Sequence, residues 1–404
     1  MQIAPVPATW YASLPRDPDL STQAFLSRVP AAMRDRGEAV SRSRYWALVL
    51  RVTVSLGALV LFLFCGAARK LAAASAGLSR YRWVQALAFT LVLLAYSFVM
   101  SLPVEAWASY ARYRGFGFSN QPFAGWLQDY VTGWASTAVF YATGIVIIAL
   151  LMRKLPRTWF LCAGCVYFVL ATIDTAATPI WIEPLTNTYS PLPDSLLKQD
   201  ILKMAQTAGV PARDVYTDDA SRQSRRLNGH VSGMFGTARI TIDDTAIGSY
   251  PAAVKALAAH EMGHYVMRHP LKMVLLEALI ETLGLAMIAA AMPLLLRNFG
   301  ARWGIHEMAA TGAIAVFWLL FTAWGFAADP VTNAYARMQE RQADNFALDL
   351  SREPLGLAEF MIQDADIGRL VPTKVDVLLF YDHPSDAERV WHAMQWRAAH
   401  PEID

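Results

Sequence analysis

The sequence predicts a mainly α protein, a multi-pass transmembrane helical bundle with a small α+β domain. Hydrophobic residues make up 55% of the 404 residues and charged residues only 17%, a balance that is shifted towards membrane proteins. Six segments each contain roughly 20 mainly apolar residues, which is the length that a membrane-spanning helix needs. A polar stretch of about 90 residues separates the fourth segment from the fifth, and about 75 residues follow the sixth. Together, these two polar regions are long enough to form a domain.

The first 45 residues form a polar tail that is rich in arginine. The tail is too long for a removed signal peptide, so we expect the N-terminus to be retained. Four transmembrane helices are expected within residues 46–178, at 46–65, 83–102, 132–152 and 158–178. The formal net charge of +2 is too small to suggest nucleic acid as a partner, because the basic residues form no long run.

A polar insert at residues 179–271 combines helices with short strands. Ser195 is a typical cap for a helix whose apolar residues recur at helical spacing until Gly209 ends it. The pattern predicts three short strands, at 215–217, 231–234 and 239–242, of which the last two are joined through Gly236. Pro251 then suits the first turn of a helix that runs to about His269, where Pro270 interrupts it.

Two further transmembrane helices are expected within residues 272–328, at 272–296 and 308–328. Residues 329–404 form a C-terminal polar part, with helices near 334–350 and from about Pro384. Two spans separate this part from the insert, so both fall on one face of the membrane and can form one domain. The arginine-rich N-terminal tail favours a cytoplasmic face for this domain, although the opposite loops also carry basic residues.

His260-Glu261-Met262-Gly263-His264 is an H-E-x-x-H motif on a predicted helix. The spacing of four residues puts both imidazoles on one face, about one turn apart, where they can share one zinc ion. Glu261 projects beside them and can take a proton from the water that the zinc activates. The alternative is an amphipathic helix whose histidines make ordinary hydrogen bonds.

A catalytic zinc ion needs a third protein ligand and an open position. Glu340 is the candidate, because it follows the sixth span on the face where the parity of the spans also puts His260 and His264. Asp344, one turn later, would accept a hydrogen bond from a histidine ring, as metal-bound imidazoles usually require. The alternative is a solvated helix whose acidic residues pair with neighbouring arginines. We therefore expect one Zn²⁺ per chain.

At this point the sequence resembles a known family, the integral-membrane zinc metallopeptidases called gluzincins. The resemblance rests on AHEMGHY at Ala259–Tyr265 and on ERQAD at Glu340–Asp344, two predicted spans later. Gluzincins of this kind include the type I CAAX prenyl endopeptidases and the related HtpX-type heat-shock proteases. Four spans before the metal-binding helix are too many for the HtpX type.

Three further segments resemble the CAAX prenyl protease branch, namely RGFGFSN at 114–120, NGHVSG at 228–233, and HP with ER at 383–384 and 388–389. The resemblance covers roughly residues 80–400. It implies that zinc lies on His260, His264 and Glu340 and that Glu261 is the general base. It also implies that His383 and Arg389 assist at the oxyanion or position the active site.

The resemblance also assigns a substrate-binding strand, made of Asn228, Gly229, His230, Val231 and Ser232. The family strand usually reads Asn-Ala-aromatic, so this chain departs from the pattern at its second and third residues. Backbone pairing with an extended substrate can survive, because it uses main-chain groups, whereas the side-chain preference is expected to differ. The eukaryotic members have seven spans, and this chain has six, so their first span is missing here.

The expected function is a membrane-embedded zinc metalloendopeptidase that hydrolyses membrane-associated or lipid-anchored, CAAX prenyl-type substrates. Its expected partners are peptide or membrane-protein substrates and membrane lipids. One alternative is a general quality-control protease of the HtpX type. Another is a zinc-binding membrane transporter or scaffold without turnover, although transport sites normally lie near the middle of the membrane. Glu277 and Glu281, in the fifth span, either line the bundle interior or lie near the interface.

Overall fold

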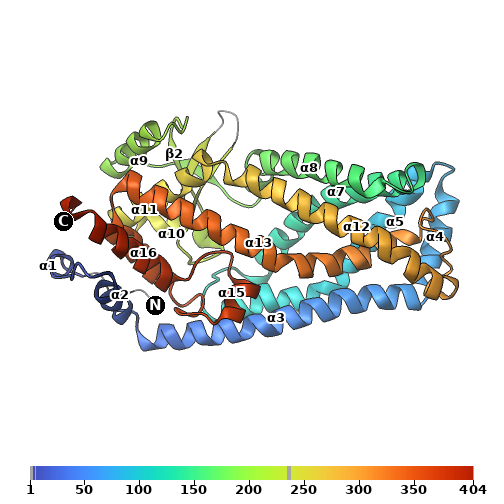
Figure 1. The fold of residues 1–404 in the computed structure, drawn as a ribbon, viewed down its shortest axis with the longest axis horizontal. Coiled ribbons are helices and arrows are strands. Elements are labelled where there is room, and N and C mark those ends of the chain that lie inside the picture. The colour runs from blue at the N-terminus through green and yellow to red at the C-terminus, as the bar shows by residue number, and fades with distance from the viewer. Residues whose placement is uncertain (1–2, 5, 234–237, 404) are drawn as a thin grey trace.

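The structure, a computed structural model, describes residues 3–4, 6–233 and 238–403. It is mainly helical and elongated, with long helices along its length and one small sheet near one end (Figure 1). Six helices are long and apolar enough to cross a membrane, which confirms the predicted multi-pass bundle. They are Ala31–Phe64, Arg82–Gly115, Phe123–Lys154, Trp159–Leu185, His269–Trp303 and Ala313–Ser351.

Four of these spans precede the sheet. The first is α3 (Ala31–Phe64), and the short helix α4 (Ala67–Leu78) connects it to the second. The second span begins as α5 (Arg82–Glu105), passes through a π-helical turn at Ala106–Ala111 and ends as α6 (Arg112–Gly115). The third and fourth are α7 (Phe123–Lys154) and α8 (Trp159–Ala177), and a π-helical turn at Thr178–Ile182 and a 3₁₀ turn at Glu183–Leu185 follow α8.

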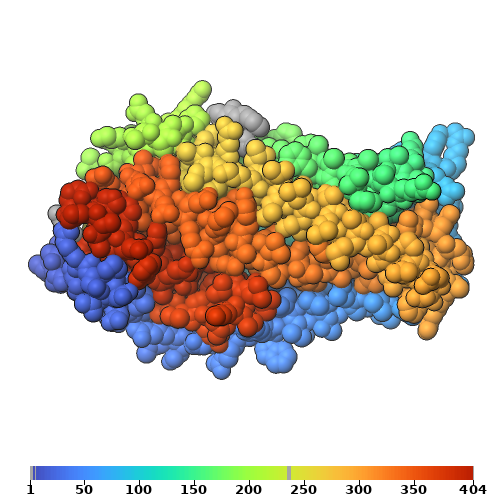
Figure 2. Space-filling model, in the orientation of Figure 1, coloured from blue at the N-terminus to red at the C-terminus, as the bar shows by residue number. Residues whose placement is uncertain are grey.

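The first 45 residues, which were predicted to form a polar tail, are largely helical in their described part. They contain α1 (Ala8–Ala12), α2 (Pro18–Ser27) and the beginning of α3. Helix α3 begins at Ala31 rather than near residue 46. Asp17 caps α2 by accepting a hydrogen bond from the backbone of Leu20. Hydrophobic residues of α2, such as Phe25, pack against the C-terminal helix α16 (Asp386–Ala399). Figure 2 shows the N-terminal and C-terminal segments together on the surface at one end of the molecule.

The predicted interruption at Pro270 lies two residues earlier. Helix α11 (Pro251–Val266) ends just before Arg268, which adopts a left-handed backbone with φ of 55°. Helix α12 (His269–Trp303) starts directly after this turn, and Pro270 occupies its first turn, where a missing backbone donor has no cost. The chain therefore bends sharply between the metal-binding helix and the fifth span.

The sixth span and the predicted helix near 334–350 are one continuous helix, α13 (Ala313–Ser351). Pro330 lies inside it without ending it. Helices associated with membranes tolerate proline, because neighbouring groups and local adjustments satisfy the freed backbone carbonyl. Glu340 and Asp344 are therefore carried on a direct extension of a membrane helix, with no joint between them and the bundle.

The sheet has four strands in the order β1-β2-β4-β3. They are β1 (Tyr189–Pro191), β2 (Val215–Asp218), β3 (Gly229–Ser232) and β4 (Arg239–Asp243). β2 and β4 run parallel, and the other two pairs are antiparallel. The predicted strand pair is confirmed as β3 and β4 in its described part, whereas Met234 and the predicted turn at Gly236 lie outside the described residues. β1 was not predicted.

Helices cover the sheet and close the small domain. Ser195 caps α9 (Leu196–Thr207), and Gly209, with φ of 72°, follows its end, as predicted. The remaining helices are α10 (Asp244–Ile247), α14 (Pro354–Gln363), α15 (Lys374–Phe380) and α16, with 3₁₀ turns at Ala220–Arg222 and Pro401–Ile403. α11 lies at the centre of this domain and packs against α9, α13, α14 and β3. This central position holds the metal-binding motif rigidly.

Candidate metal centre and active site

The two motif histidines lie on the face of α11 that meets α13. His260 is only 5% exposed, and half of the ten buried residues of α11 are alanines. The two helices approach closely at Gly263, since a β-carbon there would lie 3.2 Å from Phe346 and 3.3 Å from Ala343. The glycine in the middle of the motif therefore lets α13 come close enough for Glu340 to reach the histidines.

Three side chains converge on one point. Nε2 of His260 and Nε2 of His264 lie 3.1 Å apart. Oε2 of Glu340 lies 3.2 Å from the His260 nitrogen, and Oε1 lies 3.3 Å from the His264 nitrogen. Zinc holds nitrogen and oxygen ligands at about 2.0–2.2 Å in a tetrahedron, which puts the ligand atoms roughly 3.3 Å or slightly more apart. The two histidine nitrogens, and each of them with one oxygen of Glu340, are therefore close to the spacing that ligands of a tetrahedral zinc ion have, and one ligand atom from each residue lies within 4.8 Å of the others.

Glu340 has an unsatisfied oxygen at this point. Its Oε2 atom is buried and has no hydrogen-bond partner among the described residues, although the nitrogens of His260 and His383 lie at ion-pair distance. A buried carboxylate oxygen without a donor is costly, and a cation bound there would remove the cost. The donor set of two imidazoles and one carboxylate is also the set that catalytic zinc sites use.

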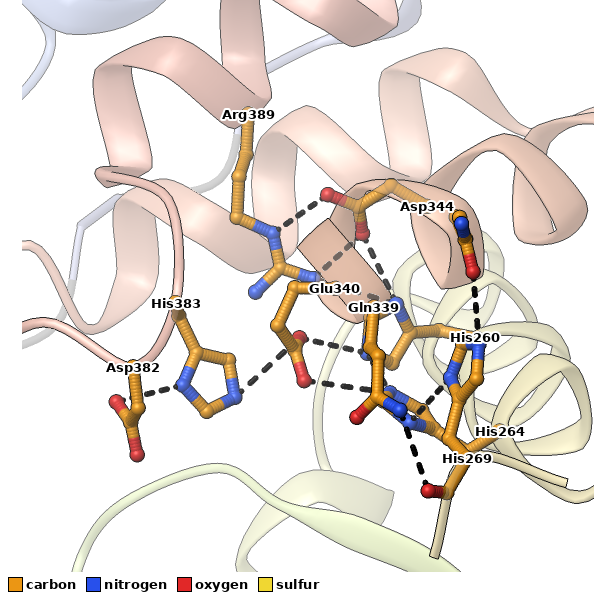
Figure 3. A network of polar contacts seen from close by, with 10 residues as sticks. His260, His264, His269, Gln339, Glu340, Asp344, Asp382, His383 and Arg389 are labelled. Carbon is orange, nitrogen blue, oxygen red and sulfur yellow. Dashed lines mark hydrogen bonds and ion pairs between the residues drawn. The ribbon is translucent and has the colours of Figure 1, made fainter. Parts of the chain in front are cut away.

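Asp344 orients the buried histidine from behind (Figure 3). Its Oδ1 atom lies 2.9 Å from Nδ1 of His260, the ring nitrogen that points away from the other ligands. Arg389, on α16, donates hydrogen bonds to both Asp344 oxygens, over 2.8 Å and 2.5 Å. Asp344 therefore accepts the Nδ1 proton and leaves Nε2 free to bind a metal. The site was predicted to contain Arg389, and its contacts favour the positioning role over the oxyanion role.

The electrostatics of the centre favour a positive charge. Burial disfavours the charged form of the His260 ring, but the adjacent carboxylates of Asp344 and Glu340 outweigh it and raise its pKa to about 10. The two carboxylates therefore attract a proton strongly to this position when no other cation is present. A metal ion would compete with that proton for the same nitrogen.

A cavity of about 580 Å³ opens beside the ligands. Glu261 and His383 both line it, together with His260, so the predicted base faces a space that a substrate can enter. Nε2 of His383 lies 3.3 Å from Oε2 of Glu340, and its Nδ1 lies 2.9 Å from Oδ1 of Asp382 (Figure 3). The side chain of His383 is 51% exposed, unlike the buried ligands. It therefore stands at the open side of the centre.

The predicted substrate strand borders the cavity at one end. Asn228 lines the cavity, and β3 continues away from it through Gly229, His230, Val231 and Ser232. Gly229 is tightly packed, because a β-carbon there would lie 3.0 Å from the backbone oxygen of Thr241. This packing leaves little room for a side chain at residue 229. His230 points to the end of the fourth span, where its Nε2 lies 3.7 Å from Glu183.

Glu277 and Glu281 lie within α12, and both are partly buried. The hydroxyl of Tyr167, on α8, donates to Oε2 of Glu277 over 3.5 Å. Oε2 of Glu281 is buried, and the described residues offer it no hydrogen-bond partner. Of the two alternatives that the sequence left open, the structure therefore favours the bundle interior.

Three polar residues near the centre were not singled out from the sequence. His269 and Gln342 lie behind His264, and Asp382 lies behind His383. Asp382 immediately precedes His383, so a carboxylate beside that histidine was a usable signal. The end of α11 and a turn separate His264 from His269. No rule of sequence spacing indicates that the ring of His269 contacts the ring of His264 across this turn.

Two sequence models of known families match the chain. The model described as peptidase family M48 matches residues 191–397, and the model described as CAAX prenyl protease N-terminal, five membrane helices, matches residues 19–188. The second match contains four of the six candidate spans together with α4. The two matches together cover almost the whole described chain.

Two curated proteins and one solved structure are similar over most of their length. The chain is 30% identical to an uncharacterized metalloprotease, YhfN, of Bacillus subtilis, over 78% of this chain and 74% of that protein. It is 27% identical to CAAX prenyl protease 1 of Saccharomyces cerevisiae, over 76% of this chain and 71% of that protein. The crystal structure of S. mikatae Ste24p superimposes with a TM-score of 0.73 at 22% identity, covering 88% of this chain and 87% of that one. The fold is therefore Ste24p-like.

Proposed function

This chain belongs to peptidase family M48, and we propose that it is a zinc-dependent endopeptidase acting on membrane-associated or lipid-anchored peptides. It is a metalloprotease with six candidate membrane spans. The finer proposal is that CAAX-type prenylated peptides are among its substrates. We also propose that its catalytic domain faces the cytoplasm, as the arginine-rich N-terminal segment suggests.

The observation that carries the proposal is the convergence of His260, His264 and Glu340 next to the cavity, which His260 itself lines. One ligand atom of each residue lies within 4.8 Å of the others, and the cavity would let a fourth ligand approach from the side of His260. An open fourth position is what separates a catalytic zinc site from a structural one. A transporter or scaffold without turnover would need neither that opening nor Glu261 beside it.

Glu261 would act as the general base. It lies next to the ligand His260 in sequence, lines the same cavity, and binds no metal itself. Zinc, when bound, would supply a Lewis acid that polarises the scissile carbonyl and lowers the pKa of water. Glu261 would take the proton from the attacking water and return it to the leaving amine, as general acid–base catalysis requires.

His383 would stabilise the developing oxyanion. Its side chain stands at the open side of the centre, with Nε2 next to Glu340 and Nδ1 held by Asp382. The carboxylate of Asp382 orients the ring. An N–H at Nε2 would then be available for the carbonyl oxygen of a substrate in the cavity. Arg389 would support catalysis indirectly, through Asp344 and His260.

The substrate would pair with the open edge of β3. The backbone N–H of Asp243 donates to the oxygen of Asn228 over 3.1 Å, so residues 228, 230 and 232 face β4. The alternate residues, Gly229 and Val231, therefore direct their N–H and C=O groups to the other side, where the described residues supply no further strand. An extended peptide can add there as a new strand through main-chain hydrogen bonds, whatever its side chains.

Membrane access would then contribute more to selectivity than sequence does. The cavity is lined by residues of α11, such as His260 and Glu261, and by Arg44 of α3, a helix that is itself a candidate span. A peptide anchored in the bilayer is concentrated at that level. CAAX prenyl protease 1 of Saccharomyces cerevisiae, with 27% identity, makes a prenylated peptide the natural first candidate. A general quality-control role of the HtpX type would need the same anchoring but no prenyl group.

The test compares three peptides in one detergent: a farnesylated CAAX-type peptide, its unprenylated form, and an unrelated membrane-anchored peptide. We expect the two anchored peptides to be cut faster than the free one, and the farnesylated peptide fastest. Val231→Pro should slow all cleavage, because it removes an N–H from the open edge of β3 without touching the ladder to β4. Fastest cleavage of the free peptide, or full activity of the proline variant, would refute the substrate model.

A further inference from the structure

The second nitrogen of His264 has a partner that the proposed zinc chemistry does not explain. Nδ1 of His264 lies 3.1 Å from Nδ1 of His269, and Nε2 of His269 lies 3.1 Å from Oε1 of Gln342. Figure 3 shows the His269 ring against His264, close to where α11 ends. Two imidazoles and one amide therefore form a line that starts at a metal ligand and ends on α13.

The chemistry of these groups fixes every proton in the line. If His264 gives the lone pair of Nε2 to a metal, its ring proton must be on Nδ1. Two facing Nδ1 atoms can share only one proton, so His269 accepts it and must carry its own proton on Nε2. The oxygen of Gln342 can only accept, and it faces that nitrogen. Only one arrangement of protons satisfies all three residues.

We propose that His269 and Gln342 are positioning residues of the metal centre, which hold the His264 ring in the tautomer that leaves Nε2 free for the metal. This proposal rests on the proposed function, because it requires a metal at Nε2. In this proposal, His269 and Gln342 orient the His264 ring in the way that Asp344 and Arg389 orient the His260 ring. The two ligand histidines thus have different supports, one anionic and one neutral.

The fold is built to hold His269 in this place. His269 is 1% exposed, although it is the first residue of a candidate membrane span. The left-handed turn at Arg268 bends the chain, and the ring of His269 lies against His264 near the end of α11. The side chain of Gln339 also donates to the backbone oxygen of His269 over 3.2 Å. Two glutamines of α13 therefore fix both its backbone and its ring.

The test measures the zinc dissociation constant by competition with a chelator, in the full-length protein. His269→Leu removes the acceptor and should weaken zinc binding by roughly 10–100-fold, the usual effect of losing such a partner. His269→Asn offers a carbonyl oxygen close to the place of Nδ1 and should bind zinc nearly as tightly as wild type. Gln342→Met should weaken binding and Gln342→Glu should not, because glutamate keeps an acceptor of the same length.

His392→Leu is the matched control. His392 also contacts a side-chain amide of α13, since its Nε2 lies 2.6 Å from Oδ1 of Asn345, but it is partly exposed and this contact involves none of the three ligands. This control should leave the zinc dissociation constant unchanged. If His269→Leu fails to fold, the comparison of Gln342→Met with Gln342→Glu tests the same chain of hydrogen bonds.

The possible failures are distinguishable. If wild type binds no zinc, the proposed function fails, and this inference fails with it. If wild type binds zinc and His269→Leu and Gln342→Met bind it as tightly, the inference fails while the proposed function stands. If His269→Asn loses as much affinity as His269→Leu, the ring only fills space, and the positioning role is refuted.

Discussion

Arg389 holds Asp344 through two hydrogen bonds, from Nε to Oδ2 over 2.8 Å and from Nη2 to Oδ1 over 2.5 Å. Both side chains are buried, and Oδ1 of Asp344 lies 2.9 Å from Nδ1 of His260. A residue of the last long helix therefore fixes a histidine of α11 through a residue of α13. The orientation of the metal ligand depends on three segments that are far apart in the sequence.

Arg389→Met should weaken both the metal centre and the fold. It leaves the Asp344 carboxylate buried without its cation, and breaking a buried ion pair in this way costs about 3–5 kcal/mol. Zinc affinity should fall by about 10–100-fold, because His260 loses a fixed orientation. Chelator competition measures the first effect, and the thermal midpoint of the zinc-free protein measures the second. The double variant Arg389→Met with Asp344→Leu should recover part of the lost stability but none of the lost zinc affinity. Recovery of zinc affinity would contradict the positioning role.

Glu340→Gln should lower zinc affinity far more than Glu277→Gln. Glu340 presents one carboxylate oxygen to each histidine at about ligand–ligand distance, whereas Glu277 contacts Tyr167 within the bundle. Zinc content after dialysis, measured on both variants, decides between them. Equal zinc content in Glu340→Gln and wild type would mean that the third ligand is another residue.

Gly263→Ala should destabilise the protein by about 1–3 kcal/mol, as overpacking usually does. The added carbon would lie 3.2 Å from Phe346, so α11 and α13 must move apart, and zinc affinity should fall as well. Gly325→Ala is the matched control on α13, where a β-carbon meets nothing within 4 Å. Thermal unfolding in detergent measures the difference. A Gly263→Ala variant as stable and as zinc-loaded as the control would show that the close approach is unnecessary.

The insert and the C-terminus should lie on one face of the membrane, with the end of α12 near Phe299 on the other. Single cysteines at Lys203, Glu402 and Asn298, in a background without the three natural cysteines, can be labelled with an impermeant reagent. All three positions are exposed. Lys203→Cys and Glu402→Cys should react from the same side. Reaction from opposite sides is incompatible with shared metal ligation.

The sequence predicts the spans and the metal ligands well because both depend on local patterns. Apolar length identifies a membrane helix, and a spacing of four residues places His260 and His264 on one helix face. The prediction of Glu340 as the third ligand required one further argument. Two spans separate it from the histidines, so all three residues fall on the same face of the membrane. The close approach of α11 and α13 could be predicted only in part. Gly263 indicates that another segment packs closely there, but the sequence does not show which segment it is.

Other features depend on tertiary contacts that no local pattern contains. The sequence places a gap between the sixth span and the helix near 334–350, yet α13 continues through Pro330, as helices associated with membranes can. β1 has three residues and ends at Pro191, too short for a strand pattern. The ring of His269 reaches His264 only because Arg268 turns the chain with a positive φ, which is rare outside glycine.

The most direct test of the central claim is the zinc content per chain of the purified protein, measured for wild type and Glu261→Gln together with their turnover of an anchored peptide. Glu261 lines the cavity but is not one of the three convergent ligands. We predict about one zinc ion per chain in both proteins and a loss of turnover in the variant of about 10²–10⁴-fold, the usual contribution of a general base. Wild-type protein without zinc, or Glu261→Gln with full turnover, would contradict the assignment of this site.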